Sequence, residues 1–232
     1  MNIAMILSGG VGTRFGGDIP KQYVRVAGRP IIAYCLATFL ADRNIDEVII
    51  CLVPEWQPFV REALEKVPAG KTVRFSRPGD TRQETIYNAL ELLEKQGCGD
   101  DDIVIIHDAA RPLVSMELIE TCLSACDGYD GVLPVLPMKD TIYQSLDGKR
   151  ISCLLDRNQL FAGQAPESFR FGKYLAAHKK LGREAVSLMK GSSEIAYKCG
   201  MNIRLIDGDE QNFKITTKED LSNFENIIGN EG

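Results

Sequence analysis

The glycine-rich stretch at residues 7–22, LSGGVGTRFGGDIPKQ, limits what this chain can fold into and bind more than any other feature. It follows an apolar run, residues 3–7, of the kind that forms a strand buried on both faces. Its five glycines free the backbone and remove the Cβ atoms that would keep a ligand at a distance, so we attribute them to ligand approach rather than to packing. Arg14 and Lys21 add two cations. The stretch therefore predicts a polyphosphate-binding loop.

The glycine spacing argues against two common phosphate-binding motifs. A dinucleotide fingerprint counted from Gly10 and Gly12 needs a third glycine at position 15, where the chain has Phe15. A Walker loop needs Gly-Lys-Ser/Thr, whereas Gly17 is followed by Asp18. A nicotinamide-dependent oxidoreductase is thus disfavoured, and the loop belongs to another class of phosphate-binding protein.

Apolar runs and amphipathic stretches alternate through the first 136 residues. The runs predict strands at 3–7, 47–53, 72–75, 102–107 and 131–136. The stretches between them predict helices at 30–40, 55–67 and 115–125, and a further helix that residues 77–85 enter and that ends at about residue 95. Such alternation is typical of a mostly parallel sheet with helices on both faces. Ligands of these sheets bind beyond the carboxyl ends of the strands, where the glycine loop and residues 79–80 and 108–111 would meet.

The alternation breaks after Met138. Residues 139–155 predict a β-hairpin that turns at Asp147-Gly148, and because an isolated hairpin is marginal in water we expect it to dock on a second subunit. An extended segment at 161–166, helices near 167–180 and 193–199, a strand at 202–206 and a last helix with a Thr216/Glu219 capping box follow. No linker interrupts the chain, which we interpret as one domain, residues 1–232, with an arm at about 139–155.

Composition excludes several classes of function. The net charge of −5 gives no overall basic field for nucleic acid or an acidic membrane, and no apolar run approaches the ~20 residues that span a bilayer. The N-terminus lacks the pattern of a signal peptide. The seven cysteines are scattered without a C-x-x-C pair, which is typical of free thiols in a reducing compartment. We therefore expect a cytoplasmic protein that binds neither nucleic acid nor membrane.

The loop spacing G-G-x-G-T-R-x-G, followed by Pro20-Lys21-Gln22, resembles the signature of nucleotidyltransferases that act on sugar or polyol phosphates. The Pro-Lys-Gln ending resembles the corresponding residues of the cytidylyltransferases that act on 2-C-methylerythritol 4-phosphate or ribitol 5-phosphate. Further motifs of this family occur in its order: Gly79-Asp80-x-Arg82-x-Glu84-Thr85, His107-Asp108-Ala109-Ala110-Arg111-Pro112, Asp140-Thr141, Arg157, Gln164-x-Pro166-x-x-Phe169 and Asn212-x-Lys214-Ile215-Thr216. The resemblance implies a Rossmann-like α/β domain with a projecting β-arm that forms a homodimer.

The resemblance also implies a role for each matching residue. Cationic side chains would act on the triphosphate and its transition state: Arg14, Lys21 and Lys214. The nucleotide would be bound by Leu7, Ser8, Gly9, Gly10, Gly12, Gly79, Asp80, Arg82, Thr85 and Ala109. The acceptor would be bound by Asp108, Arg111, Thr141, Arg157, Ala165 and Ser192, with Arg157 acting across the dimer. Asp108 would also hold the Mg²⁺ cofactor. We expect His107 to be structural and assign no role to His178.

The acceptor is less well defined than the donor, CTP. This chain departs from the isoprenoid enzymes at two places. They usually have Thr-Pro where this chain has Ala165-Pro166, and Thr-Asp-Glu where it has Ser192-Ser193-Glu194. Pro54-Glu55-Trp56 resembles the ribitol enzymes, whereas Asp156-Arg157-Asn158 resembles the isoprenoid branch. We favour D-ribitol 5-phosphate, a precursor of wall or capsule polymers such as teichoic acid, and keep 2-C-methyl-D-erythritol 4-phosphate of isoprenoid biosynthesis as the alternative. A catalytically inactive nucleotide sensor is the alternative of another class.

Overall fold

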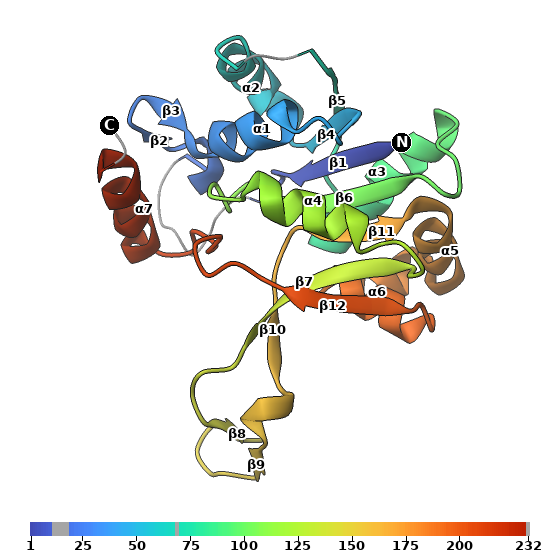
Figure 1. Ribbon diagram of the computed structural model, residues 1–232, viewed down its shortest axis with the longest axis vertical. Coiled ribbons are helices and arrows are strands. Elements are labelled where there is room, and N and C mark those ends of the chain that lie inside the picture. Colours follow the sequence, from blue (N-terminus) through green and yellow to red (C-terminus); the bar gives the residue numbers. More distant parts are fainter. Residues whose placement is uncertain (11–18, 68–69, 231–232) are drawn as a thin grey trace.

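A central sheet organises the computed structural model, which describes residues 1–10, 19–67 and 70–230 (Figure 1). Within these residues the sheet has eight strands in the order β10-β7-β11-β6-β1-β4-β5, with β12 also paired to β7. Its parallel part comprises β1 (Asn2–Leu7), β4 (Glu47–Cys51), β5 (Thr72–Ser76) and β6 (Ile103–Asp108). The other strands are β7 (Gly131–Pro137), β10 (Phe161–Gly163), β11 (Glu167–Arg170) and β12 (Ile203–Asp207). The predicted α/β fold with a mostly parallel sheet is confirmed.

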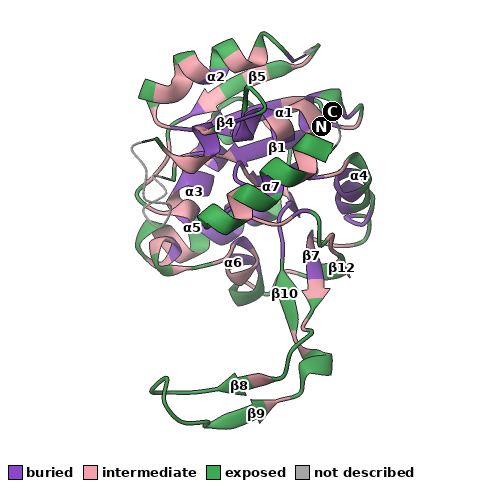
Figure 2. Cartoon of the chain, turned by 90° about the vertical axis from the view of Figure 1, so that its left-hand side faces the viewer, coloured by how far each residue is buried: buried purple, intermediate pink, exposed green. Residues whose placement is uncertain are grey.

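Helices cover both faces of this sheet, as Figures 1 and 2 show. One apolar layer packs beneath α1 (Ile31–Ala41), α2 (Gln57–Leu64) and α4 (Met116–Ser124). The opposite layer packs beneath α3 (Arg82–Lys95), α5 (Phe171–Leu188) and α6 (Ser192–Lys198). Strand β1 sends Ala4 and Ile6 into the first layer and Ile3 and Met5 into the second, because successive side chains of a strand point to opposite faces. This double burial explains why the strand is continuously apolar.

Strand β11 corrects the predicted secondary structure. The sequence predicts that a helix begins near residue 167, but residues 167–170 form a strand between β6 and β7, antiparallel to both. Phe169 in this strand is fully buried and stacks on Tyr174 with ring centroids 4.0 Å apart. The two neighbouring strands supply hydrogen bonds on both sides, and this long-range pairing outweighs the local helical pattern. Helix α5 begins only at Phe171.

The arm leaves the sheet between β7 and β10 and ends in the pair β8 (Ile142–Gln144) and β9 (Cys153–Leu155). It projects from the body and is mostly exposed along its length (Figure 2). The hairpin turns within residues 145–152, which include the predicted Asp147-Gly148, and in this loop Asp147 accepts hydrogen bonds from the backbone N–H groups of Lys149 and Arg150. These bonds stabilise the tip locally, so the arm forms without a long strand ladder.

The remaining short elements close the body. They are β2 (Arg25–Val26), β3 (Arg29–Pro30), the 3₁₀ turns η1 (Lys21–Tyr23), η2 (Pro54–Trp56) and η3 (Arg157–Gln159), and α7 (Lys218–Asn230). The capping box of α7 lies one residue later than expected, because Thr217 and Asp220, and not Thr216 and Glu219, exchange the two side-chain-to-backbone bonds. Among the described helices, none is long and apolar enough to cross a bilayer.

Candidate active site

A pocket of about 340 Å³ opens at the carboxyl ends of β1 and β6, beside the start of α3. It brings together most of the residues that the sequence singled out, namely Leu7, Ser8, Gly9, Gly10, Lys21, Gly79, Asp80, Arg82, Thr85, Asp108, Ala109 and Lys214. It adds Gln22, Thr81, Ala110 and Thr216, to which the sequence analysis assigned no site role. The position agrees with the rule that parallel sheets bind ligands beyond these strand ends. Gly12 and Arg14 lie outside the described residues.

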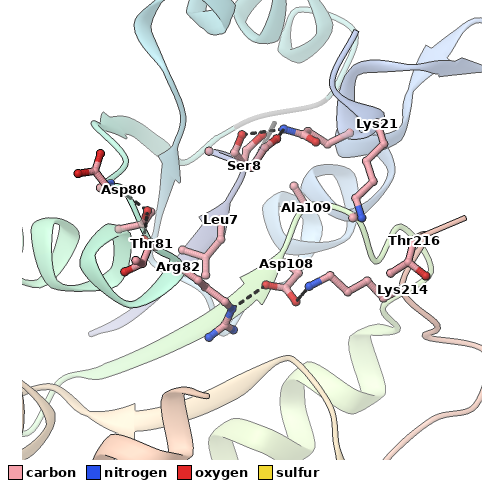
Figure 3. A pocket seen from close by; sticks show the side chains of 16 residues that line it. Leu7, Ser8, Lys21, Asp80, Thr81, Arg82, Asp108, Ala109, Lys214 and Thr216 are labelled. Atoms are coloured by element: carbon pink, nitrogen blue, oxygen red, sulfur yellow. Dashed lines mark hydrogen bonds and ion pairs between the residues drawn. The ribbon is translucent and has the colours of Figure 1, made fainter. Parts of the chain in front are cut away.

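The start of the glycine loop is fixed by side chains that follow the loop in sequence. Gln22 donates from Nε2 to the carbonyl oxygens of Ser8 and Gly10, both at 2.8 Å. The Ser8 hydroxyl donates to the hydroxyl of Tyr23, whose ring stacks on Trp56 with centroids 4.3 Å apart. The Pro-Lys-Gln ending therefore has two effects. Gln22 holds the backbone at the start of the loop, and η1 directs the charged side chain of Lys21 into the pocket (Figure 3).

Two pocket glycines are required by packing, which corrects the expectation that the loop glycines serve ligand approach alone. A Cβ on Gly9 would lie 2.4 Å from Cβ of Pro78, and one on Gly79 would lie 2.4 Å from Cβ of Glu84. Gly79 would also meet the Glu84 backbone at 2.9 Å, where no side chain can yield. A Cβ on Gly10 would meet nothing within 4 Å, so that position does leave open space above the backbone.

The start of α3 forms the second wall of the pocket. Thr81 caps the helix and forms a reciprocal capping box with Glu84. The hydroxyl of Thr85 accepts a hydrogen bond from the N–H of Gly79 at 3.0 Å and donates to the carbonyl of Thr81 at 2.9 Å. Thr85 lines the pocket, but these two bonds occupy its hydroxyl in shaping the loop that carries Asp80.

Asp108 ends β6 and joins the pocket cations. Its Oδ1 accepts from Nε of Arg82 at 3.1 Å and its Oδ2 accepts from Nζ of Lys214 at 2.7 Å (Figure 3). Burial alone would raise the pKa of Asp108, but the charges of Arg82 and Lys214 outweigh it and hold the pKa well below its usual range. Lys21 extends toward the same space from η1, on the same side of Asp108 as Lys214 in the view of Figure 3. The site thus holds a carboxylate whose pKa is lowered, so that it is ionised at neutral pH, among at least three cationic side chains.

The side chains of the pocket also limit which metal ion could bind there and how. Among the described residues no group of three His, Cys, Asp or Glu side chains is arranged to hold an ion. Asp108 offers one carboxylate, and its two hydrogen bonds leave acceptor capacity on both oxygens. One carboxylate fits a Mg²⁺ ion that takes its other ligands from phosphates and water, which is how this cation is usually held.

His107 and Arg111 lie behind the pocket and do not line it. His107 is fully buried, and burial lowers its pKa to about 4, so its ring is neutral at pH 7 and contacts the carbonyl of Arg111 at 2.9 Å. Arg111 donates from Nη1 to the carbonyl of Asn212 at 2.6 Å rather than pairing with Asp108. His107 is therefore placed as a structural residue, as expected, and Arg111 supports the segment that carries Lys214.

The other acceptor candidates are spread over the molecule. Thr141 and Arg157 are exposed in the arm, where Arg157 donates to the carbonyl of Lys139. Ala165 is buried and accepts from Asn212 through its carbonyl. Ser192 is buried beside the pocket, where its hydroxyl accepts from Nη1 of Arg82 at 2.6 Å. Within one chain, then, the structure brings only Ser192 of these four against a pocket residue.

Comparison with known proteins gives a family. The family model described as IspD, 2-C-methyl-D-erythritol 4-phosphate cytidylyltransferase, matches residues 2–230. A protein of that name from Cereibacter sphaeroides is 36% identical over 97% of this chain and 96% of its own length. The structure resembles 4-diphosphocytidyl-2C-methyl-D-erythritol synthase from Anaerococcus prevotii, with a TM-score of 0.82, 23% identity and 98% of both chains covered. The 2-C-methyl-D-erythritol 4-phosphate cytidylyltransferase from Thermus thermophilus gives a TM-score of 0.74 at 27% identity, also over 98% of both chains.

Proposed function

The chain belongs to the 2-C-methyl-D-erythritol 4-phosphate cytidylyltransferase (IspD) family, and from this we propose that it transfers CMP from CTP to 2-C-methyl-D-erythritol 4-phosphate. It is a nucleotidyltransferase, as the sequence analysis expected. The comparisons favour methylerythritol phosphate, the alternative acceptor, over the ribitol 5-phosphate that short local patterns favoured. The observation that carries the proposal is the convergence of Lys21, Lys214 and Asp108 at the strand ends.

The two sides of the pocket suit the two halves of CTP. Figure 3 shows Asp80 and Thr81 on one side of the site and Lys21 on the other. The backbone around Gly79 and the Asp80 carboxylate offer polar contacts to a base edge, and Gly10 leaves room for a close approach. Lys21 and Lys214 suit a triphosphate, because fixed cations stabilise charge that develops during phosphoryl transfer.

The proposed reaction is one displacement at phosphorus. An oxygen of the acceptor's phosphate monoester forms a bond to the α-phosphorus of CTP, and the bond from this phosphorus to the α,β-bridging oxygen breaks to release pyrophosphate. The nucleophile is already anionic near pH 7, so no general base is required, which agrees with the neutral, buried His107. The residues must instead offset repulsion between anions, and Lys21 and Lys214 carry the charge to do so.

Asp108 is the residue that would hold Mg²⁺ together with the phosphates of CTP. A bound Mg²⁺ would act as a Lewis acid that neutralises charge on the phosphate oxygens. Lys214 contacts Asp108 in the structure and lines the same pocket, so a phosphate bound beside Asp108 would lie within its reach.

We also propose that the arm forms a homodimer and completes the acceptor site of a second copy. The arm carries four exposed apolar side chains, Tyr143, Leu146, Ile151 and Leu154. Exposing them to water does not stabilise a monomer, whereas burying them against a second copy would stabilise a dimer. Thr141 and Arg157 lie on the same arm, and neither lines the pocket of its own chain. Light scattering tests this part: we expect about twice the 25.7 kDa of one chain, and the monomer mass would refute it.

Pyrophosphate release with CTP tests the acceptor. We expect turnover with 2-C-methyl-D-erythritol 4-phosphate and at least about tenfold lower kcat/KM with D-ribitol 5-phosphate, which lacks the branching methyl group. A higher kcat/KM with ribitol 5-phosphate would instead support the acceptor that the sequence analysis favoured. CTP binding without turnover on either acceptor would instead indicate a nucleotide sensor.

A further inference from the structure

Glu167 is a buried carboxylate that the proposed reaction leaves without a role. It lies on β11 and is 7% exposed. Its Oε1 accepts from Nη2 of Arg82 at 3.4 Å, and its Oε2 accepts from the backbone N–H of Ser193 at 3.1 Å and from the Ser193 hydroxyl. Glu167 thus stands between the start of α6 and the guanidinium that faces Asp108.

The guanidinium of Arg82 is held by three different elements of the fold. Nε donates to Asp108 on β6, Nη1 donates to Ser192 on α6, and Nη2 donates to Glu167 on β11. A rigid planar group with every nitrogen engaged has one orientation, whereas an arginine with a single partner keeps several rotamers. Glu167 is the one anion in this set besides Asp108 itself.

This restraint matters because Arg82 and Lys214 share Asp108. A triphosphate in the pocket attracts every mobile cation near it, and Lys214 must turn toward the α-phosphate in the proposed reaction. If Arg82 followed, Asp108 would lose both of its side-chain counter-charges in a mostly buried position, which is unfavourable, and only a bound cation would offset its charge. The contacts to Glu167 and Ser192 keep Arg82 at the carboxylate while Lys214 moves.

We propose that Glu167 is a positioning residue, which fixes Arg82 as the permanent counter-ion of Asp108 and so frees Lys214 to act on the α-phosphate. This inference rests on the proposed function for its kinetic consequence only. An amide cannot replace the carboxylate, because Gln has one acceptor oxygen and its NH₂ group would face a donor on Arg82 or on Ser193.

The geometric part is tested without turnover. In the NMR spectrum, the Nε–H signal of Arg82, assigned by its loss in Arg82→Lys, should exchange slowly with water in the wild type. We expect Glu167→Gln to speed that exchange at least about tenfold, because it releases one of the three anchors. The matched control is Asp130→Asn, which removes a mostly buried carboxylate that pairs with Lys173 away from the pocket. An unchanged Arg82 signal in Glu167→Gln would overturn the proposal whatever the enzyme does.

A double-mutant cycle tests the catalytic part. We expect Glu167→Gln to lower kcat about tenfold to a hundredfold with a smaller change in the KM for CTP, and Asp130→Asn to leave both unchanged. In an Arg82→Lys background, Glu167→Gln should add less than about threefold, because it acts through Arg82. Fully additive losses would overturn the proposal.

A transplanted carboxylate provides the rescue. The side chains of Glu167 and Ser193 are in contact. In the double variant Glu167→Gln with Ser193→Asp, the new carboxylate at position 193 can therefore accept from the Gln NH₂ group, which leaves the Gln oxygen to face Arg82. We expect kcat to return to within about threefold of the wild type, and no recovery would count against the proposal. A wild type that lacks turnover would refute the proposed function, while the exchange of the Arg82 proton would still decide the role of Glu167.

Discussion

Replacing Asp108 by Asn should destabilise the protein in a way that depends on pH. The carboxylate is mostly buried, with 13% of its side chain exposed, and each oxygen accepts from a different cation, Arg82 or Lys214. Asn keeps one acceptor and turns an NH₂ group toward the other cation. The variant therefore leaves two positive groups facing each other without the charge that separated them.

The magnitude follows from burial. Hydrogen bonds to charged groups contribute about 1.5–3 kcal/mol, and breaking a fully buried ion pair costs about 3–5 kcal/mol. Arg82 and Lys214 are 28% and 36% exposed, so water screens part of the interaction. We expect Asp108→Asn to lower the free energy of unfolding by about 2 kcal/mol at pH 7.

The pH dependence gives the sharper test. A carboxyl whose folded-state pKa is lowered adds stability that is complete above its unfolded pKa, about 3.9, and is lost as pH falls through the folded value. The Asp108 pKa is lowered in this sense, since its two cationic partners outweigh the effect of burial. In urea unfolding, the difference between wild type and Asp108→Asn should be full at pH 7 and smaller by about 1 kcal/mol at pH 3. Equal stabilities at pH 7, or a difference that does not shrink in acid, would refute the reasoning.

Three further predictions concern Lys21, Gly79 and the two histidines. Lys21→Ala should lower kcat by about 10²–10³-fold while the thermal midpoint stays within a few degrees, and a normal kcat would remove Lys21 from the mechanism. Gly79→Ala should cost about 1–3 kcal/mol of unfolding free energy and weaken CTP binding in calorimetry, whereas Gly229→Ala, whose Cβ meets nothing within 4 Å, should do neither. Burial lowers the pKa of His107 and of His178 to about 4, so the unfolded chain binds protons first and stability should fall as pH drops from about 6.5 to 5. We expect a loss of about 1–2 kcal/mol per histidine, and a His178→Gln variant with an unchanged slope would contradict it.

The convergence of Gly79, Asp108 and the glycine loop on one pocket could be predicted because each lies at or directly after a strand end. Gly79, Asp108 and the glycine loop each lie at or just after the end of a strand of the parallel sheet, and parallel strands bring their carboxyl ends to one edge. Lys214 follows no such strand, and its place beside Asp108 was expected only from the family resemblance. The sequence analysis did not recognise that Gly9 is required by its contact with Pro78, because that neighbour is distant in the chain.

The contacts that hold Arg82 could not be predicted from local patterns. Arg82 contacts Glu167 and Ser192, which are 85 and 110 residues away in the sequence. Strand β11, which carries Glu167, is four residues long and runs directly into α5, so no periodicity marks it. Its existence depends on pairing with β6 and β7, and pairing of this kind is a property of the whole fold.

The acceptor shows the same limit of local reasoning. Short patterns such as Pro54-Glu55-Trp56 favoured a ribitol enzyme, but these residues form η2, against the sheet layer of α1 and α2, and Trp56 stacks on Tyr23. They report on packing around the loop rather than on the acceptor. Similarity along the whole chain is therefore the better guide to the acceptor.

Tracing the α-phosphorus of CTP tests the central claim most directly. The purified protein is incubated with Mg²⁺, 2-C-methyl-D-erythritol 4-phosphate and CTP that is labelled at the α-phosphorus, and the products are separated by mass. Attack at the α-phosphorus predicts that the label appears in the diphosphate of a cytidine-linked product and that the released pyrophosphate is unlabelled. Label in the pyrophosphate, or unchanged CTP in the presence of the acceptor, would contradict the account.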